Sequence, residues 1–218
     1  YSKILTEDNF VCGYLTVPAD EGKTVKAVPV YRVENEAVLD AQTLEELDWR
    51  LRPVEEYQKP EYTDIANHYV KEYAEKLLVM GMYYPSNELR PDDAVTQKEY
   101  LQLISQVVFH NSYLDSDDVF YNDLIRRGVL TKEDVRPDSP ITRIEGIRYL
   151  LNALGYKEFA NIPGIFNCPF ADVNETDKGY GAIAAGLHLV NSETDIFYAD
   201  SNLKRGDSLI IIYNYLNR

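Results

Sequence analysis

One pattern occurs three times along this chain of 218 residues, and it constrains the fold more than any other feature. It runs as an apolar residue, a variable residue, proline or alanine, aspartate, two variable residues, an aliphatic residue, threonine or lysine, two variable residues and an acid. The copies occupy residues 89–99, 135–145 and 197–207, without gaps. Self-similarity of this kind indicates one small structural unit that is used three times.

Helical periodicity flanks each copy. Before the first copy, apolar residues recur at intervals of three and four, at Val70, Tyr73, Ala74, Leu77 and Leu78. After it they recur in the same way, at Leu101, Ile104, Val107 and Val108. The other two copies have similar stripes on both sides, so each unit is expected to fold as helix, irregular loop and helix. Such a unit is too thin to bury its own apolar face, so the three are expected to share one core.

The sequence marks where the first helix of each unit should end. Gly81 and Gly128 suit the left-handed position that terminates a helix. The third unit has no glycine there, and Asn191, which tolerates left-handed geometry, is expected to take its place.

The junction from the loop into the second helix has its own signal. Thr96 and Thr142 each lie three residues before a glutamate, which is the spacing of a capping box. In the third copy Lys204 replaces the threonine, so no side-chain cap is expected there. Asp207 is then expected to contribute only its negative charge near the helix N-terminus.

Capping does not explain the arginine that follows the cap position in the second and third copies, Arg143 and Arg205. A guanidinium beside a helix N-terminus presents donors where backbone N–H groups also converge, which suits a carboxylate ligand. The alternative is an arginine that pairs with one of the 36 acidic residues of the chain. The residues alone leave both interpretations open.

The chain before the repeats has a different character. Residues 9–17 and 26–33 are rich in β-branched and aromatic residues, and they predict two strands with turn chemistry between them. Three leucines in residues 44–51 share one helical face, and residues 52–60 read as a charged linker marked by prolines. The sequence therefore predicts a short β-rich segment with its linker over residues 1–58.

From about residue 60 to 218 the sequence resembles the S-layer homology (SLH) family. Units of that family open on Phe-x-Asp-Val, place a Trp at a helix start, end the helix at Gly and pass through a Phe-x-Pro loop to Thr-Arg-Ala-Glu. The best matches to these motifs are residues 62–65, 96–99, 142–145, 170–173 and 204–207. The resemblance implies a mainly α fold, in which SLH-like helix-loop-helix units at 59–109, 110–160 and 161–218 surround a central three-helix bundle.

The same resemblance implies a function. Members of the family anchor proteins to the bacterial cell surface, outside the cell, by non-covalent binding of cell-wall polysaccharides that are often pyruvylated. It implies that the glycan-binding residues are Arg143, Arg205, Tyr69, Tyr180, Gly81 and Gly128. Gln97 stands where the first arginine should be, and this favours an alternative, a degenerate SLH-like structural or protein-interaction module without glycan binding. Residues 28–43 have a weaker similarity to the end of a PepSY-like domain.

Composition and the absence of known motifs narrow the classes of function that remain. A formal net charge of −14 argues against a nucleic-acid partner, which requires a basic surface. No apolar run approaches the roughly 20 residues that cross a bilayer. The sequence lacks the motifs of nucleophilic hydrolases, zinc proteases, phosphate-binding loops and paired-cysteine sites. No catalysis, cofactor or metal is therefore predicted. Cys12 and Cys168 allow at most one disulfide, and free thiols are expected.

Overall fold

The computed structural model describes residues 10–19, 24–33, 37–42, 60–109 and 116–217. The chain divides into two compact units, Tyr1–Gln58 and Lys59–Arg218. The predicted helical face at 44–51 and the predicted linker at 52–60, except for its last residue, lie outside the described residues.

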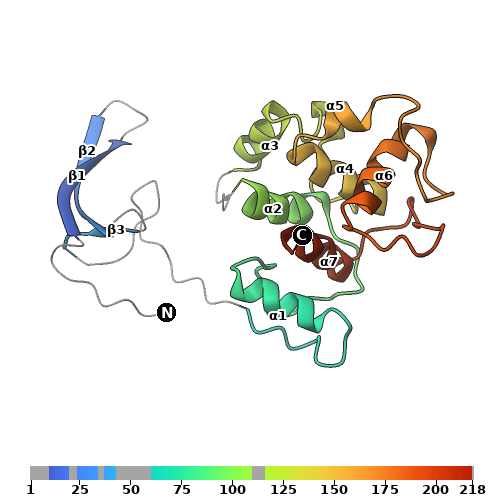
Figure 1. Ribbon diagram of the computed structural model, residues 1–218. Coiled ribbons are helices and arrows are strands. Elements are labelled where there is room, and N and C mark those ends of the chain that lie inside the picture. Colours follow the sequence, from blue (N-terminus) through green and yellow to red (C-terminus); the bar gives the residue numbers. More distant parts are fainter. Residues whose placement is uncertain (1–9, 20–23, 34–36, 43–59, 110–115, 218) are drawn as a thin grey trace. The chain divides into compact units, whose positions relative to one another are not determined.

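The first unit contains an antiparallel sheet with the strand order β1-β2-β3. The strands are β1 (Phe10–Ala19), β2 (Thr24–Val33) and β3 (Ala37–Asp40). Residues Phe10 and Val33 are partners in the β1–β2 ladder, and Ala19 and Thr24 pair at its other end. The two strands predicted from β-branched and aromatic residues are therefore confirmed, with β1 ending and β2 beginning slightly closer together in the sequence than predicted (Figure 1).

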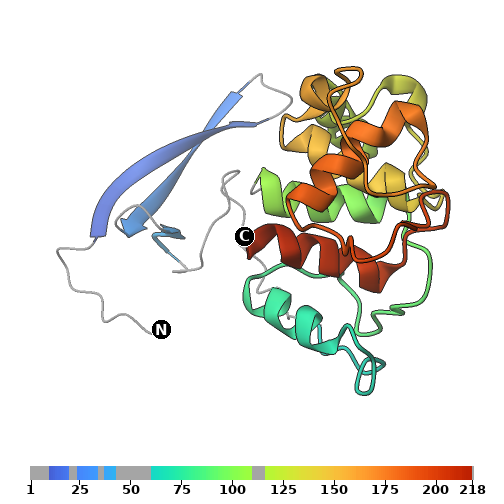
Figure 2. The same ribbon diagram turned by 45° about the vertical axis from the view of Figure 1, so that its right-hand side comes forward.

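The second unit is helical, so the prediction of a mainly α protein is confirmed. Its described elements are α1 (Lys71–Val79), α2 (Gln97–Val108), α3 (Asp117–Arg126), η3 (Lys132–Asp134), α4 (Arg143–Ala153), α5 (Lys157–Ala160), η4 (Glu175–Asp177), α6 (Lys178–Gly186) and α7 (Arg205–Leu216). In both views of the ribbon α7 runs between α1 and α2 (Figures 1 and 2). Helix α1 packs against α7, α6 packs against α4, and α2 contacts both α4 and α7.

One hydrophobic core serves all the repeats, as the thinness of each unit predicts. Leu77 of α1, Ile104 of α2, Leu124 of α3, Ile147 of α4 and Ile212 of α7 are fully buried in the same cluster. Burying a side chain of this size stabilises the fold by about 1.5–3 kcal/mol. Because these side chains come from helices of all three repeats and pack in one cluster, the helices depend on one another.

The three motif loops form a closed ring at the centre of this unit. The aliphatic residues at the same motif position, Val95, Ile141 and Leu203, are all fully buried. The N–H of Val95 donates to the carbonyl of Leu203 (2.9 Å), that of Leu203 to Ile141 (2.8 Å), and that of Ile141 to Val95 (3.2 Å). Each motif therefore bonds to both of the others in the same way, and residues at matching motif positions can be compared directly.

The helix starts follow the predicted capping pattern. The Thr96 hydroxyl accepts the N–H of Glu99 (3.3 Å), whose carboxylate accepts the N–H of Thr96 (3.0 Å). A second complete capping box joins Thr142 to Glu145 at the start of α4. Lys204 makes no side-chain cap at the start of α7, as expected.

The helix ends follow the prediction in two units and depart from it in the third. Gly81 and Gly128 adopt left-handed backbone, with φ of 79° and 75°. In the third unit the residue in this conformation is His188, with φ of 55°, so the prediction of Asn191 is wrong. His188 lies two residues beyond the last residue of α6, as the glycines do beyond α1 and α3. The position along the helix therefore decides which residue is left-handed, at a cost of roughly 1–2 kcal/mol for histidine.

Candidate functional site

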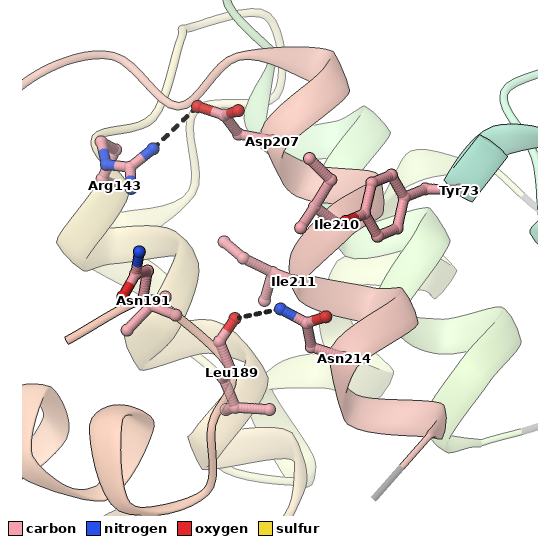
Figure 3. A pocket seen from close by; sticks show the side chains of 9 residues that line it. Tyr73, Arg143, Leu189, Asn191, Asp207, Ile210, Ile211 and Asn214 are labelled. Atoms are coloured by element: carbon pink, nitrogen blue, oxygen red, sulfur yellow. Dashed lines mark hydrogen bonds and ion pairs between the residues drawn. The ribbon is translucent and has the colours of Figure 1, made fainter. Parts of the chain in front are cut away.

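A pocket of about 310 Å³ opens beside Arg143. We call it the Arg143 pocket. Its lining comes from α1, the start of α4, the turn after α6 and one face of α7, and consists of Tyr73, Arg143, Leu189, Val190, Asn191, Asp207, Ile210, Ile211 and Asn214. Ile210 and Ile211 lie between the Arg143–Asp207 pair at one end and the amide of Asn214 at the other (Figure 3). The pocket thus combines an apolar floor with polar groups at its two ends.

Asp207 joins two of the residues that the sequence nominated. Nη1 of Arg143 donates to Oδ2 of Asp207 (2.8 Å), and the Tyr69 hydroxyl donates to Oδ1 (2.7 Å). Partial burial of Tyr69, and then this bond to the carboxylate, raise the pKa of Tyr69 above its ordinary value. Asp207 therefore does more than place a charge at a helix start, and the expectation of that limited role is wrong. Residues from three separate repeats meet at one carboxylate.

The Arg143 guanidinium is held on several sides. Its Nε donates to the carbonyl oxygen of Phe197 (3.0 Å), and its central carbon lies 5.0 Å from the centre of the Phe197 ring. About a quarter of both side chains in the Arg143–Asp207 pair is exposed, 23% and 26%. The pair has no net charge, but it presents N–H donors and carboxylate acceptors side by side. Such an arrangement suits a ligand hydroxyl, which both donates and accepts hydrogen bonds.

Arg205 occupies the same motif position but is 3% exposed. Its Nε donates to the carbonyl oxygen of Leu89 (2.7 Å), and its guanidinium pairs with Glu99 and lies 4.2 Å from the centre of the Tyr84 ring. Burial alone would raise the pKa of Glu99, but the Thr96 N–H and the Arg205 charge lower it below its ordinary value. Arg205 therefore lies in the interior, covered by the protein's own side chains.

Gln97 fills the corresponding position in the first motif and is fully buried. Its amide donates to the Asp134 carbonyl and the Tyr149 hydroxyl, both at 2.8 Å, and its Oε1 accepts the N–H of Arg136 (2.8 Å). The Arg136 side chain in turn pairs with Glu145. Arg136 therefore supplies, from a different motif position, the guanidinium that Gln97 lacks. As a result, the acid of every motif has an arginine partner.

The other predicted glycan-binding residues lie apart from the Arg143 pocket. Tyr180 is buried, and its hydroxyl donates to Asn152 Oδ1 (2.9 Å) and accepts from Asn161 Nδ2 (3.1 Å). Gly81 and Gly128 form the turns after α1 and α3, where an added Cβ would meet no atom within 4 Å. Of the six predicted glycan-binding residues, only Arg143 and Tyr69 are brought together, through Asp207.

The sequence reasoning missed most of the pocket. Asp207, Ile210, Ile211 and Asn214 lie on one face of α7, at spacings of three, four and seven residues. This spacing is present in the sequence, but nothing in it distinguishes a face that lines a pocket from one that packs in the core. Asn191 was singled out for its backbone and proves to line the pocket instead.

Comparison of the sequence with models of known protein families found no match, and comparison with curated proteins found no similar one. The site is therefore defined by its own geometry. Among the described residues, no cluster of histidine, cysteine and acidic side chains is suited to hold a metal ion. None of the described helices has the length and apolar character needed to cross a membrane.

Proposed function

We propose that the Lys59–Arg218 unit is a non-catalytic anchoring module that binds a bacterial secondary cell-wall polysaccharide in the Arg143 pocket. One observation carries the proposal. Arg143, Tyr69 and Asp207, which come from three different repeats, converge at the edge of a pocket of about 310 Å³. Under this proposal the module acts outside the cell, at the bacterial cell surface.

The lining of the pocket supports a saccharide as ligand. The Arg143–Asp207 pair and the amides of Asn191 and Asn214 offer donors and acceptors to sugar hydroxyls. Tyr73 and the two isoleucines of α7 offer apolar surface to the C–H face of a sugar ring. Tyr69 is 56% exposed beside the pair, so its ring is accessible to a neighbouring sugar of the same polymer.

The motif resemblance and the ring of motif loops support the finer part of the proposal. Helices α2, α4 and α7 each follow one copy of the motif, and in an SLH-like arrangement they are the central three-helix bundle. The three SLH-like units are then residues 59–109, 110–160 and 161–218. The first helix of the first unit, α1, packs against the second helix of the third, α7, which is consistent with units that interlock around one axis.

A second candidate function has its own support. Arg205 and Gln97 are buried and bonded to neighbouring motifs, so two of the three equivalent positions serve the interior of the fold. This favours a degenerate SLH-like module that is structural or binds a protein and has lost glycan binding.

A sedimentation assay with purified bacterial cell wall separates the two candidates. The native protein is expected to sediment with the wall, and not with wall stripped of its polysaccharide. Arg143→Ala is expected to weaken binding at least tenfold, which corresponds to about 1.4 kcal/mol. Arg126→Ala, at a side chain 77% exposed on α3, is the matched control and should bind normally. Absence of binding by the native protein supports the degenerate module.

A further inference from the structure

The loop that leads into α6 contains Asn174-Glu175-Thr176. This is the acceptor pattern for attachment of a sugar to asparagine, Asn-x-Ser/Thr with any residue except proline in the middle. It occurs once in the 218 residues of the sequence. A short pattern of this kind also arises by chance, so its structural setting decides whether it can be used. A usable acceptor lies in a loop on the surface, with its amide accessible.

The structure provides this setting. The side chains of Asn174, Glu175 and Thr176 are exposed, whereas the neighbours on either side, Val173 and Asp177, are only 4% and 8% exposed. The backbone N–H of Asp177 donates to the carbonyl oxygen of Asn174 (2.8 Å), which closes the segment into a turn. The three residues therefore project from the surface, held at both ends by buried neighbours. A sugar on Asn174 can extend into solvent without displacing a buried group.

The two side chains that define the acceptor are not engaged in the fold. An asparagine at the start of a helical turn commonly uses its side chain as a cap. Asn174 makes no such bond at the start of η4. Within the part of the chain that the structure describes, neither the Asn174 amide nor the Thr176 hydroxyl has a hydrogen-bond partner. An enzyme can therefore bind both groups without breaking a hydrogen bond of the protein.

The first repeat uses the same position differently. Asn67 lies four residues before the first residue of α1, as Asn174 lies four residues before the first residue of α6. The residue two places after Asn67 is Tyr69, whose hydroxyl donates to Asp207. The equivalent residue in the third repeat is Thr176. This position of the repeat thus supports the Arg143 pocket in one unit and forms a free acceptor pattern in another.

We infer that Asn174 is an acceptor for N-linked glycosylation by an oligosaccharyltransferase, with a lipid-linked oligosaccharide diphosphate as donor. In this reaction Nδ2 of Asn174 forms a bond to the anomeric carbon of the first sugar, and the bond from that carbon to the diphosphate oxygen breaks. The lipid diphosphate leaves with the bonding electron pair, and one amide proton passes to a base of the transferase. The inference goes beyond the proposed function and shares with it only a location outside the cytoplasm.

The test is the intact mass of the full chain after export in a bacterium that carries an oligosaccharyltransferase and its lipid-linked donor. The mass is expected to increase by one oligosaccharide. Trypsin releases residues 158–178 as one peptide, which also contains Asn161 and Asn167. Both of these asparagines lack a hydroxyl residue two places later, so they are internal controls when fragmentation of the peptide locates the sugar on Asn174.

Four variants test the assignment. Asn174→Gln and Thr176→Ala are expected to abolish the modification, whereas Thr176→Ser keeps a hydroxyl and should be modified. Asn67→Gln, at the equivalent exposed asparagine of the first repeat, is the matched control and should be modified like the native protein. All of these side chains are exposed, so every variant should unfold at the native urea midpoint, and so should the glycosylated protein.

An unmodified native protein overturns the inference, as does a sugar on another residue or a modification that persists in Thr176→Ala. A glycosylated protein that unfolds at a lower urea midpoint also contradicts it, because the attached sugar would then disturb the fold. The outcome is independent of the wall assay. Arg143→Ala should be glycosylated as fully as the native protein, whether or not the native protein binds the wall.

Discussion

Arg143 and Arg205 occupy the same position of the same motif, and each pairs with the acid of another motif, yet Arg143 lines the pocket described above and Arg205 is 3% exposed. The turn that follows the first helix of each unit accounts for the difference. Tyr84, three residues beyond Gly81, places its ring 4.2 Å from the Arg205 guanidinium. Asn191 is the equivalent residue, three beyond His188, and is too small to cover Arg143 in this way. One turn residue thus separates an arginine that lines a pocket from an interior ion pair.

The largest expected difference between these regions is in stability. Arg205→Ala leaves Glu99 without its partner, opens a cavity beneath Tyr84 and is expected to lower the free energy of unfolding by about 3 kcal/mol. Arg143→Ala breaks a pair that is about a quarter exposed, and should cost about 1 kcal/mol or less. Urea unfolding of both variants measures this. Equal losses would show that the two arginines have the same structural role.

The turn residue provides the next test, on binding. Asn191→Tyr introduces the side chain that covers Arg205 and is expected to close the Arg143 pocket, with at least a tenfold loss of affinity for the polysaccharide. Asn191→Ala keeps the pocket open and should lose several fold at most, through one amide. Calorimetric titration compares the two variants with the native protein. Undiminished binding by Asn191→Tyr places the ligand elsewhere.

The helix starts allow a smaller comparison. Thr142→Ala removes the cap of α4 and is expected to lower the free energy of unfolding by about 1 kcal/mol. Lys204→Ala at the uncapped start of α7 removes only an exposed pair with Asp92 and should change it by less than about 0.5 kcal/mol. Thermal melts of both variants decide this, and a larger loss for Lys204→Ala would contradict the assignment of the caps.

The smallest effect concerns pH. Because the folded protein holds the pKa of Glu99 below its ordinary value, the ionised carboxylate stabilises the fold above the unfolded pKa of about 4.3. This stabilisation is lost as the pH falls through the lower, folded pKa. Glu99→Gln should therefore flatten the decline of stability in this acidic range, measured by unfolding at several pH values. An unchanged slope would mean that Glu99 is not stabilised as a carboxylate.

Local chemistry explains which predictions hold. The capping boxes of Thr96 and Thr142 and the left-handed glycines depend on a few adjacent residues, so the sequence is enough to place them. The left-handed conformation of His188 was not predicted, because histidine is not a residue that marks this conformation. Only its position after α6 indicates it. The Tyr69–Asp207 bond joins residues far apart in the chain, so periodicity gives no sign of it.

The same limit applies to the arginines. Whether Arg205 is buried depends on Tyr84, and whether the missing arginine at Gln97 matters depends on Arg136, which replaces its charge. Both contacts depend on which motif loop lies next to which, and the sequence does not give this order. The repeat could be predicted from the sequence, whereas the differences between its copies depend on contacts among the units.

The central claim is that residues from three repeats form a saccharide site beside Arg143. The most direct measurement is an NMR titration of the labelled protein with fragments of the cell-wall polysaccharide. The account predicts that the fragments shift the amides of residues 189–191 and 207–214 most strongly, and that these shifts vanish in Asn191→Tyr. Shifts confined to other surfaces, or none at saturating concentration, would contradict it.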